Sequence, residues 1–369
     1  MARFLSSSAN ASLAAVALVV VMGLGMGQVS VALMDPAIRE IPASFDDIRK
    51  GSTAAQLERG VEKRIPWRDG LVAAACGLRY VLGHGGGSEV VVGSDGWLFL
   101  ADELRYHAEA AKETRVKLDT LGEANRTLAK RGIALVVALV PDKARLYSSR
   151  LPDRAVVSYD AARYSAAIDG LRARGVAVVD LGAPLGQGAF ASPTYYLTDT
   201  HWNQKGARIA ADAIASSVRA RGVARGEAKF RETAGAETER PGDLIRLMGL
   251  DHAPRAMRPA ADREAPVVVE EIADASTGGG LFGAATVDAV LLGTSYSRRA
   301  SFHGFLQEAL GMRVLDASKD GGGFGQSAAT YFANAAFRES PPKVIVWEIP
   351  ERVLPETDEA GATLAKLLR

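Results

Sequence analysis

The chain of 369 residues contains a single cysteine, Cys76, and carries almost no net charge. One cysteine excludes an intramolecular disulfide and a zinc site built from several thiolates. The apolar residues before Cys76 indicate a small buried side chain. Lys and Arg number 44 against 43 Asp and Glu, so the composition does not favour broad attraction to nucleic acid. We therefore expect no nucleic-acid partner.

Long apolar runs are also scarce, and only the N-terminus has one that approaches a membrane span. Arg3 and a serine-rich stretch precede apolar segments at residues 11–26 and 29–34, which is the pattern of an export signal. Residues 30–32 could be a cleavage site, whereas residues 11–34 are long enough to stay in a bilayer, which needs about 20 apolar residues. A buried core helix is the other alternative. We favour an uncleaved anchor over residues 1–34, with the rest of the chain exported.

A phosphate-binding loop is absent as well. The glycine-rich run at residues 83–88 lacks the lysine and the spacing of such a loop, and we interpret it as a turn. We assign residues 35–104 to a polar neck followed by a β-hairpin. In this hairpin, residues 90–92 and 97–100 flank the turn sequence Gly-Ser-Asp-Gly. No nucleotide cofactor and no metal are expected.

The remainder of the chain alternates between buried strands and helices, which predicts an α/β fold with a parallel sheet flanked by helices. We assign this domain to residues 105–352, with an insertion at 223–285 and a C-terminal tail at 353–369. The predicted strands are residues 133–140, 176–181, 287–292, 313–315 and 344–349, and the predicted helices are residues 108–131, 159–174, 202–221, 301–310 and 324–338.

Three side chains near the ends of these elements suggest acyl transfer or ester hydrolysis. Asp199 and His201 lie two residues apart before a predicted helix, and Ser295 follows a predicted buried strand. Ligands of parallel sheets bind at the carboxyl ends of the strands. A serine nucleophile needs an imidazole to accept its proton and a carboxylate to orient the imidazole. An Asp-x-His pair is a weak signal alone, and an unpartnered histidine and an ordinary strand-end serine are the alternatives.

An oxyanion hole would need backbone N–H groups near the reacting serine. The glycine run at residues 321–323 follows a predicted strand and opens a helix, which makes Gly322 and Gly323 candidates, together with the N–H of Ser295. A flexible turn is the alternative for the glycines. Tyr296, next to the serine, is a further candidate for contact with the substrate.

The segment after the strand at 133–140 carries polar side chains on the same edge of the predicted sheet. Lys143, Arg145 and Tyr147 could contact an anionic sugar there, and a solvated loop is an equally good interpretation. Glu348 is a charged residue within an apolar strand, so we expect it to pair with a cation or to line the cleft.

Several of these motifs together resemble the bacterial alginate O-acetyltransferase family. The resemblance runs from about residue 60 to residue 352, and its motifs occur in the family's order. They are Pro66–Asp69, Gly93–Phe99, Pro141–Arg145, Thr198–Trp202, Gly293–Ser297 and Trp347–Arg352.

The resemblance implies an SGNH-hydrolase-like fold in a circularly permuted order, because the Asp and the His precede the Ser. It implies that Asp199, His201 and Ser295 form a catalytic triad, and it matches Gly322 or Gly323 to the oxyanion glycine. The chain ends soon after the last predicted strand, without the C-terminal carbohydrate-binding module of one branch of the family, so it is more similar to the membrane-anchored branch.

From this resemblance we expect a periplasmic O-acetyltransferase, tethered to the inner membrane, that acts on an exopolysaccharide such as alginate or cellulose through an acetyl-serine. The implied partners are a membrane-bound O-acyltransferase that delivers acetyl groups and other subunits of polysaccharide export. Two alternatives stay open at this point. One is an O-acetylesterase with the same triad, and the other is a non-catalytic polysaccharide-binding scaffold of an export complex.

Overall fold

The computed structural model describes residues 23, 26–27, 30–31, 33–41, 44–62, 68–83, 85–156, 160–272, 287–358 and 364. The chain divides into two compact units, residues 1–77 with 252–254 and residues 78–251 with 255–369. Most of residues 1–34, where the anchor is predicted, lies outside the described residues. No helix in the described ranges is both long and apolar enough to cross a membrane. Helices of the first unit are α2 (Pro36–Arg39), α3 (Phe45–Arg49), α4 (Ser52–Glu62) and the first part of α5 (Arg68–Gly83).

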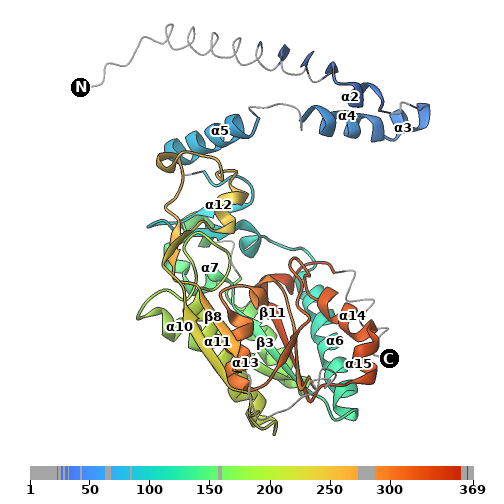
Figure 1. Cartoon of the computed structure of the whole chain (residues 1–369), viewed down its shortest axis with the longest axis vertical. Helices are drawn as coiled ribbons and strands as arrows, with labels where there is room; N and C mark the ends of the chain where they lie inside the picture. The colour runs from blue at the N-terminus through green and yellow to red at the C-terminus, as the bar shows by residue number, and fades with distance from the viewer. Residues whose placement is uncertain are drawn as a thin grey trace. The chain divides into compact units, whose positions relative to one another are not determined.

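A parallel sheet forms the centre of the second unit (Figure 1). Its five strands lie in the order β10–β9–β11–β3–β4, and every neighbouring pair is parallel. This confirms the predicted α/β fold. The strands are β3 (Ala134–Val140), β4 (Ala177–Asp180), β9 (Ala289–Leu292), β10 (Val314–Asp316) and β11 (Val344–Pro350).

Both faces of the sheet are covered, which explains why its central strands are almost entirely apolar, with Glu348 in β11 as the exception. Along β3, residues Val136, Ala138 and Val140 pack into one core with α11 and α13, and the alternate residues pack into a second core with α6, α9 and α14. Figure 1 shows α11 and α13 on one side of the sheet and α6 and α14 on the other. These helices are α6 (Ala110–Lys130), α9 (Arg163–Ala173), α11 (Gln204–Ala220), α13 (Phe302–Leu310) and α14 (Gln326–Ala333).

The predicted hairpin is present as β1 (Val90–Val92) and β2 (Leu98–Leu100), which pair antiparallel. Asp95 and Gly96 both have positive φ in its turn, a conformation that an Asp-Gly pair adopts readily. The helix predicted over 324–338 is interrupted, which corrects that prediction. Asn334 has an extended backbone, and its side chain accepts a hydrogen bond from the N–H of Ala336, at 2.9 Å, to cap a second helix, α15 (Ala335–Glu339).

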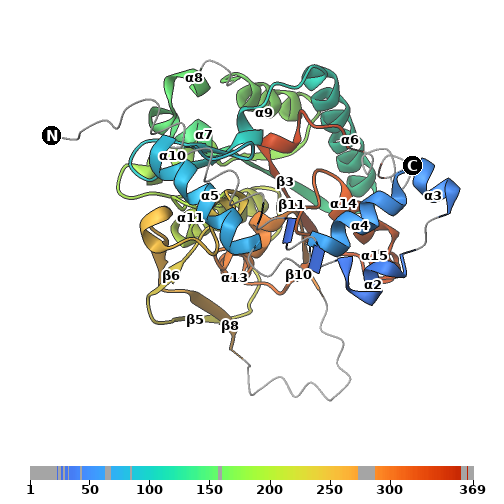
Figure 2. The ribbon, with the colours of Figure 1, turned by 90° about the horizontal axis from the view of Figure 1, so that it is seen from above.

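The segment at 223–285 contains short strands that the sequence pattern did not reveal, because most of their residues are either charged or exposed. β5 (Phe230–Ala234) pairs with β8 (Val267–Glu271), and β6 (Thr238–Arg240) pairs with β7 (Asp262–Glu264), both antiparallel. A short helix, α12 (Asp243–Leu247), follows β6. These strands lie at the periphery of the second unit (Figure 2). Residues 273–286 lie outside the described residues.

Candidate active site

A tight loop before α11 carries Asp199 and His201. Tyr195 and Trp202 form an isolated antiparallel bridge, so the chain folds back on itself over residues 196–201. Asn203 then caps α11, and its side-chain oxygen accepts a hydrogen bond from the N–H of Gly206 at 3.0 Å. The bridge and the cap fix the loop at both ends, which places the histidine directly before the helix.

Ser295 lies where the chain leaves the carboxyl end of β9. It begins a short 3-10 helix, η4 (Ser295–Arg298), and its side chain is partly exposed. Gly293 precedes this helix at a point of close approach, where an added Cβ would lie 2.3 Å from Ser297 Oγ and 2.6 Å from Glu348 Oε2. Only glycine fits there without displacing the buried carboxylate, so the strand exit depends on this residue.

Glu348 holds the same strand exit from the neighbouring strand β11. Its carboxylate accepts hydrogen bonds from the N–H of Thr294 at 2.7 Å, from the Thr294 hydroxyl and from the Ser297 hydroxyl at 3.0 Å. The side chain is fully buried, and this burial raises the pKa of Glu348. Its hydrogen-bond partners are therefore neutral donors. The sequence had instead predicted that Glu348 pairs with a cation or lines the cleft.

Ser295, His201 and Asp199 form a continuous hydrogen-bonded chain. The Nε2 atom of His201 lies 2.8 Å from Ser295 Oγ, and its Nδ1 atom lies 2.6 Å from Asp199 Oδ1. The backbone N–H of His201 also donates to that oxygen, at 3.0 Å. An Nδ1–H that donates to the carboxylate leaves Nε2 free to accept the proton of the serine. The structure therefore brings together the three residues predicted from the sequence.

The second oxygen of Asp199 is held by the segment at 223–285. Arg240 Nη1 donates to Asp199 Oδ2 at 2.9 Å, and the N–H of Asp243 donates to it at 3.2 Å. Burial alone would raise the pKa of Asp199, but the hydrogen bond and charge of His201, together with Arg240, hold it well below its usual range. The carboxylate therefore stays ionised beside the imidazole.

Two further carboxylates hold the loop itself. Asp243 Oδ1 accepts from the N–H of Thr200 at 2.8 Å and from its hydroxyl at 3.0 Å. Asp262 accepts from the N–H groups of Leu197 and Thr198, at 2.8 and 2.9 Å, and from the Thr198 hydroxyl at 2.6 Å. These two residues and Arg240 were not predicted from the sequence, because nothing in their local pattern indicates that they reach a loop some 40 to 65 residues earlier.

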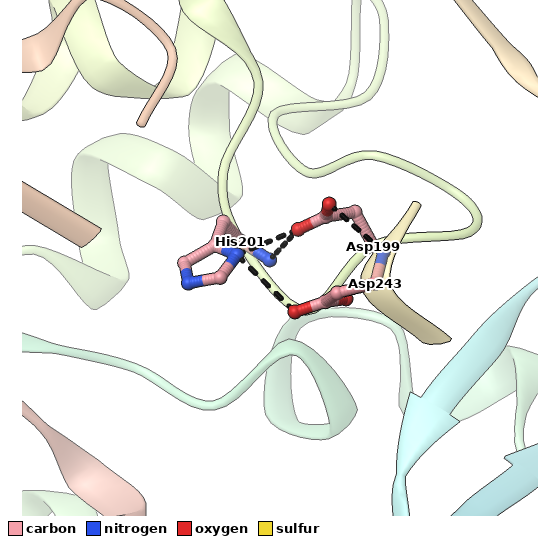
Figure 3. A group of neighbouring side chains, drawn as sticks. All are labelled: Asp199, His201 and Asp243. Atoms are coloured by element: carbon pink, nitrogen blue, oxygen red, sulfur yellow. Dashed lines mark hydrogen bonds and ion pairs between the residues drawn. The ribbon is translucent and has the colours of Figure 1, made fainter. Parts of the chain in front are cut away.

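A second carboxylate oxygen also lies near the imidazole. Figure 3 shows Asp199 and Asp243 on the Nδ1 side of the His201 ring, with Nε2 pointing away from both. Asp243 Oδ2 is 3.6 Å from Nδ1, which is too long for a hydrogen bond but close enough to stabilise a positive charge on the ring. This arrangement favours the imidazolium that forms when the serine loses its proton.

The donor atoms of Asp199, His201 and Asp243 lie within 4.8 Å of one another, and within the described ranges they form a group that could hold a metal ion. A cation there would displace the Nδ1 proton and would face the guanidinium of Arg240, which already occupies Asp199 Oδ2. The donor set therefore fits proton transfer better than metal binding.

Tyr296 supports the imidazole from the side. Its ring meets the His201 ring edge to face with centroids 4.8 Å apart, and its hydroxyl donates to the carbonyl of Thr200 at 3.0 Å. The side chain is fully buried, and burial raises its pKa above the usual range, although Arg352 acts in the opposite direction. Tyr296 thus orients His201 and presents no exposed surface to a substrate.

The predicted sugar contacts occupy different positions. Lys143 is completely buried, and its ammonium donates to the carbonyls of Leu98, Leu197 and Asp199 at 2.6 to 3.0 Å, so all three of its N–H donors are used. Burial lowers the pKa of Lys143 to about 8. This side chain joins the hairpin to the loop that carries the histidine.

Arg145 and Tyr147 line a surface pocket, and their side chains bond to residues outside the triad. Arg145 makes a two-pronged contact with Glu351, with distances of 2.9 and 2.6 Å. The ring of Tyr147 stacks on Trp97 with centroids 4.0 Å apart, and its hydroxyl accepts from the N–H of Thr194 at 2.8 Å.

The loop that contains the glycine run is tied to the serine segment at Lys319. The N–H of Lys319 donates to the carbonyl of Gly293 at 3.0 Å, which ties the start of this loop to the exit of β9. The N–H of Gly322 donates to the carbonyl of Lys319 at 3.0 Å and is thereby engaged within the loop. Gly323 has φ of 53°, a conformation that favours glycine.

A parallel sheet whose carboxyl edge carries a linked serine, histidine and aspartate defines a serine-dependent α/β hydrolase or acyltransferase. Residues 90–351 match the model of the SGNH hydrolase-like domain of acetyltransferase AlgX. The chain therefore belongs to this SGNH hydrolase-like acetyltransferase family, as the sequence motifs predicted.

Individual relatives agree with this assignment. The probable alginate O-acetylase AlgJ of Pseudomonas putida is 33% identical over 277 residues, which cover 74% of this chain and 72% of AlgJ. AlgX of Pseudomonas aeruginosa is 30% identical over 71% of this chain and 55% of AlgX. Among solved structures, the O-acetyltransferase domain of Pseudomonas putida AlgJ has a TM-score of 0.66 at 31% identity, covering 76% of this chain and 98% of that domain. The Pseudomonas aeruginosa AlgX structure has a TM-score of 0.57 at 25% identity, covering 76% of this chain and 66% of AlgX.

Proposed function

We propose that this chain is an O-acetyltransferase that acetylates hydroxyl groups of a bacterial exopolysaccharide. The observation that carries the proposal is the hydrogen-bonded chain from Ser295 through His201 to Asp199. The names of the relatives, which are alginate O-acetylases and an alginate biosynthesis protein, support an acidic polysaccharide as the acceptor.

The proposed reaction proceeds through an acetyl-serine. Ser295 Oγ attacks the acetyl carbonyl of the donor while His201 Nε2 takes the serine proton, and the protonated imidazole then gives that proton to the departing donor oxygen. A sugar hydroxyl enters, His201 removes its proton, and the sugar oxygen attacks the acetyl carbon. Ser295 leaves with the proton from His201, which restores the starting state. Asp199 holds the Nδ1 proton throughout.

The negative charge on the carbonyl oxygen needs backbone donors. We assign this role to the N–H groups of Ser295 and Gly323. The contact between the Lys319 N–H and the Gly293 carbonyl supports the assignment, because it keeps the glycine loop against the serine segment. Gly322 is the weaker candidate, since its N–H already has an acceptor.

We also propose that residues 1–34 direct the chain to the periplasm and tether it to the inner membrane, on the evidence of their charge and apolar pattern. The acetyl donor would then reach Ser295 from a membrane-bound O-acyltransferase, and other export subunits would deliver the polysaccharide.

The test is acetyl transfer by the purified full chain from an activated acetyl ester, with and without an acidic oligosaccharide. Mass spectrometry should detect an acetyl group on Ser295 and then on the sugar. Ser295→Ala should lower turnover by about 10⁴-fold or more, whereas Ser216→Ala, at an exposed position of α11, should leave it unchanged. Acetate release without sugar acetylation would indicate an esterase, and unchanged turnover in Ser295→Ala would overturn the proposal.

A further inference from the structure

A pocket of about 770 Å³ lies beside the short helix α7 (Lys143–Leu146) and helix α10 (Gly182–Ala189). These two helices contact each other and lie side by side in Figure 2. α7 follows the carboxyl end of β3, and α10 follows the carboxyl end of β4. The pocket is therefore on the same edge of the sheet as Ser295, which follows β9.

Two other pockets lie at the opposite edge. Both are lined by Asp288 and Met312, which precede β9 and β10. Ligands of parallel sheets bind at the carboxyl edge, so of these three pockets, all lined by described residues, the pocket beside α7 and α10 has the position that suits a substrate. β4 is three strand positions from β9 in the sheet, which corresponds to roughly 14 Å. A chain of several sugars would be needed to reach from the serine to this pocket.

The pocket is also continuous with the loop that holds the triad. Leu197 lines it, two residues before Asp199, and its carbonyl accepts from the same Lys143 ammonium as the carbonyl of Asp199. A molecule bound in the pocket would therefore contact the segment that positions the histidine.

The charges of the lining residues favour an anion. Arg145 and Arg150 both line the pocket, and none of the described residues that line it carries a carboxylate. Arg145 is fixed by Glu351, and Arg150 pairs with Asp95. The Arg150–Asp95 pair is exposed, with 44% and 69% of the two side chains accessible, so a ligand carboxylate can compete for this guanidinium at little cost.

The uncharged lining residues are typical of a carbohydrate site. Phe190 is 92% exposed at the end of α10 and offers a ring face to a sugar. Trp97 and Tyr147, stacked on each other, form part of the wall, and Gln187 and Ser149 supply exposed amide and hydroxyl groups. Apolar ring surface with a few oriented polar groups is the usual composition of a ligand pocket.

We propose that this pocket is a distal subsite for an acidic acceptor polysaccharide, which binds a carboxylate-bearing sugar several units away from the hydroxyl that Ser295 acetylates. The proposal rests on the proposed acetyltransferase function. It assigns Phe190 and Arg150 to acceptor binding, and it predicts that their effect depends on the length of the acceptor.

The test compares acetyl transfer to uronic-acid oligosaccharides of increasing length with transfer to neutral oligosaccharides. For long acidic acceptors, Phe190→Ser and Arg150→Gln should each raise KM by about 2- to 10-fold, with kcat unchanged. For a monosaccharide acceptor, and for hydrolysis of the activated acetyl ester alone, neither variant should change the kinetics. Neutral acceptors should not respond to Arg150→Gln.

Matched controls lie outside the pocket. Tyr106 is 83% exposed and does not line the pocket, so Tyr106→Ser controls for loss of an exposed aromatic ring. Arg172→Gln controls for loss of an exposed, paired arginine. A blocking variant is Gly186→Leu, because a Cβ at Gly186 would lie in ordinary contact, 3.8 Å from Leu146 Cδ2. It should raise KM for long acceptors while Gly186→Ala does not.

Each outcome separates the subsite from the active site. If long acidic acceptors respond to the pocket variants no more than to the controls, the subsite is wrong, and ester hydrolysis by the same proteins still reports on the triad. If neutral and acidic acceptors respond equally to Arg150→Gln, the assignment of an acidic sugar is wrong. If Ser295→Ala retains transfer, the proposed function fails independently of the pocket.

Discussion

Residues 198–201 and 293–297 carry the reacting side chains, whereas residues 240–264 carry the side chains that hold the first of these segments. One reacting segment precedes helix α11 and the other follows strand β9, and both are buried except at Ser295, which is partly exposed. The holding segment comprises Arg240 at the end of β6, helix α12 and strand β7, all of which lie outside the central sheet. The catalytic loop is thus held by polar contacts from a peripheral segment that contributes no reacting atom.

The largest expected effect comes from the carboxylate where the two regions meet. In Asp199→Asn, the new amide should turn its oxygen toward Arg240 and the N–H of Asp243, because these groups already donate to Oδ2. Its NH₂ group then faces His201 Nδ1, which forces the ring proton onto Nε2. Such a histidine cannot accept the serine proton, so kcat should fall by about 10⁴-fold, measured as turnover of an activated acetyl ester.

A double variant sharpens this prediction. In Asp199→Asn/Arg240→Gln, the guanidinium that orients the amide is gone, while the N–H of His201 still donates on the other side at 3.0 Å. The amide oxygen can then turn back toward His201, and about 10-fold of the lost kcat should return. A double variant that is no more active than Asp199→Asn would show that Arg240 does not set the tautomer.

The difference between the two regions also explains what the sequence could reveal. The strands of the sheet are apolar runs, so β3, β4, β9 and β11 could be predicted within a few residues, and the carboxyl-edge rule placed Ser295 near His201. Lys143 was a visible charge after a strand, but its burial under the hairpin depends on tertiary packing. Arg240 and Asp262 are paired across β6 and β7, and Asp243 begins α12 just after β6, so all three reach the loop through tertiary packing that no local pattern encodes.

An intermediate effect is expected from Asp262, which touches no reacting atom. Asp262→Ala removes three hydrogen bonds to Leu197 and Thr198, so the adjoining Asp199 is positioned less well. We expect kcat for the activated ester to fall by about 10-fold, with a lower melting temperature and little change in KM. Glu270→Ala is the control, because Glu270 is exposed in β8, which also belongs to the segment at 223–285. Unchanged kcat in Asp262→Ala would mean that the loop holds its shape without this segment.

The smallest effect concerns stability and its dependence on pH. Arg240 is one of the groups that lower the pKa of Asp199, and its guanidinium also lies over the Tyr196 ring, 4.0 Å from the centroid. A carboxylate whose folded-state pKa is lowered stabilises the fold above its unfolded pKa, which is about 3.9, and this contribution is lost as the pH falls further. Arg240→Gln weakens that contribution, so it should destabilise the protein by about 1–3 kcal/mol near pH 7.

The unfolded chains titrate alike, so the stability difference between the wild-type protein and Arg240→Gln should narrow only as the pH falls through the folded-state pKa that Asp199 has in the variant, which lies nearer the usual range than in the wild-type protein. Denaturant unfolding at pH 7 and at pH 2 measures the difference, and Arg240→Lys, which keeps the charge but loses the planar fork, should give an intermediate value. A difference that stays constant across this range would attribute the role of Arg240 to its packing on Tyr196. The peripheral segment would then support the loop through shape, and its charge would not tune the catalytic carboxylate.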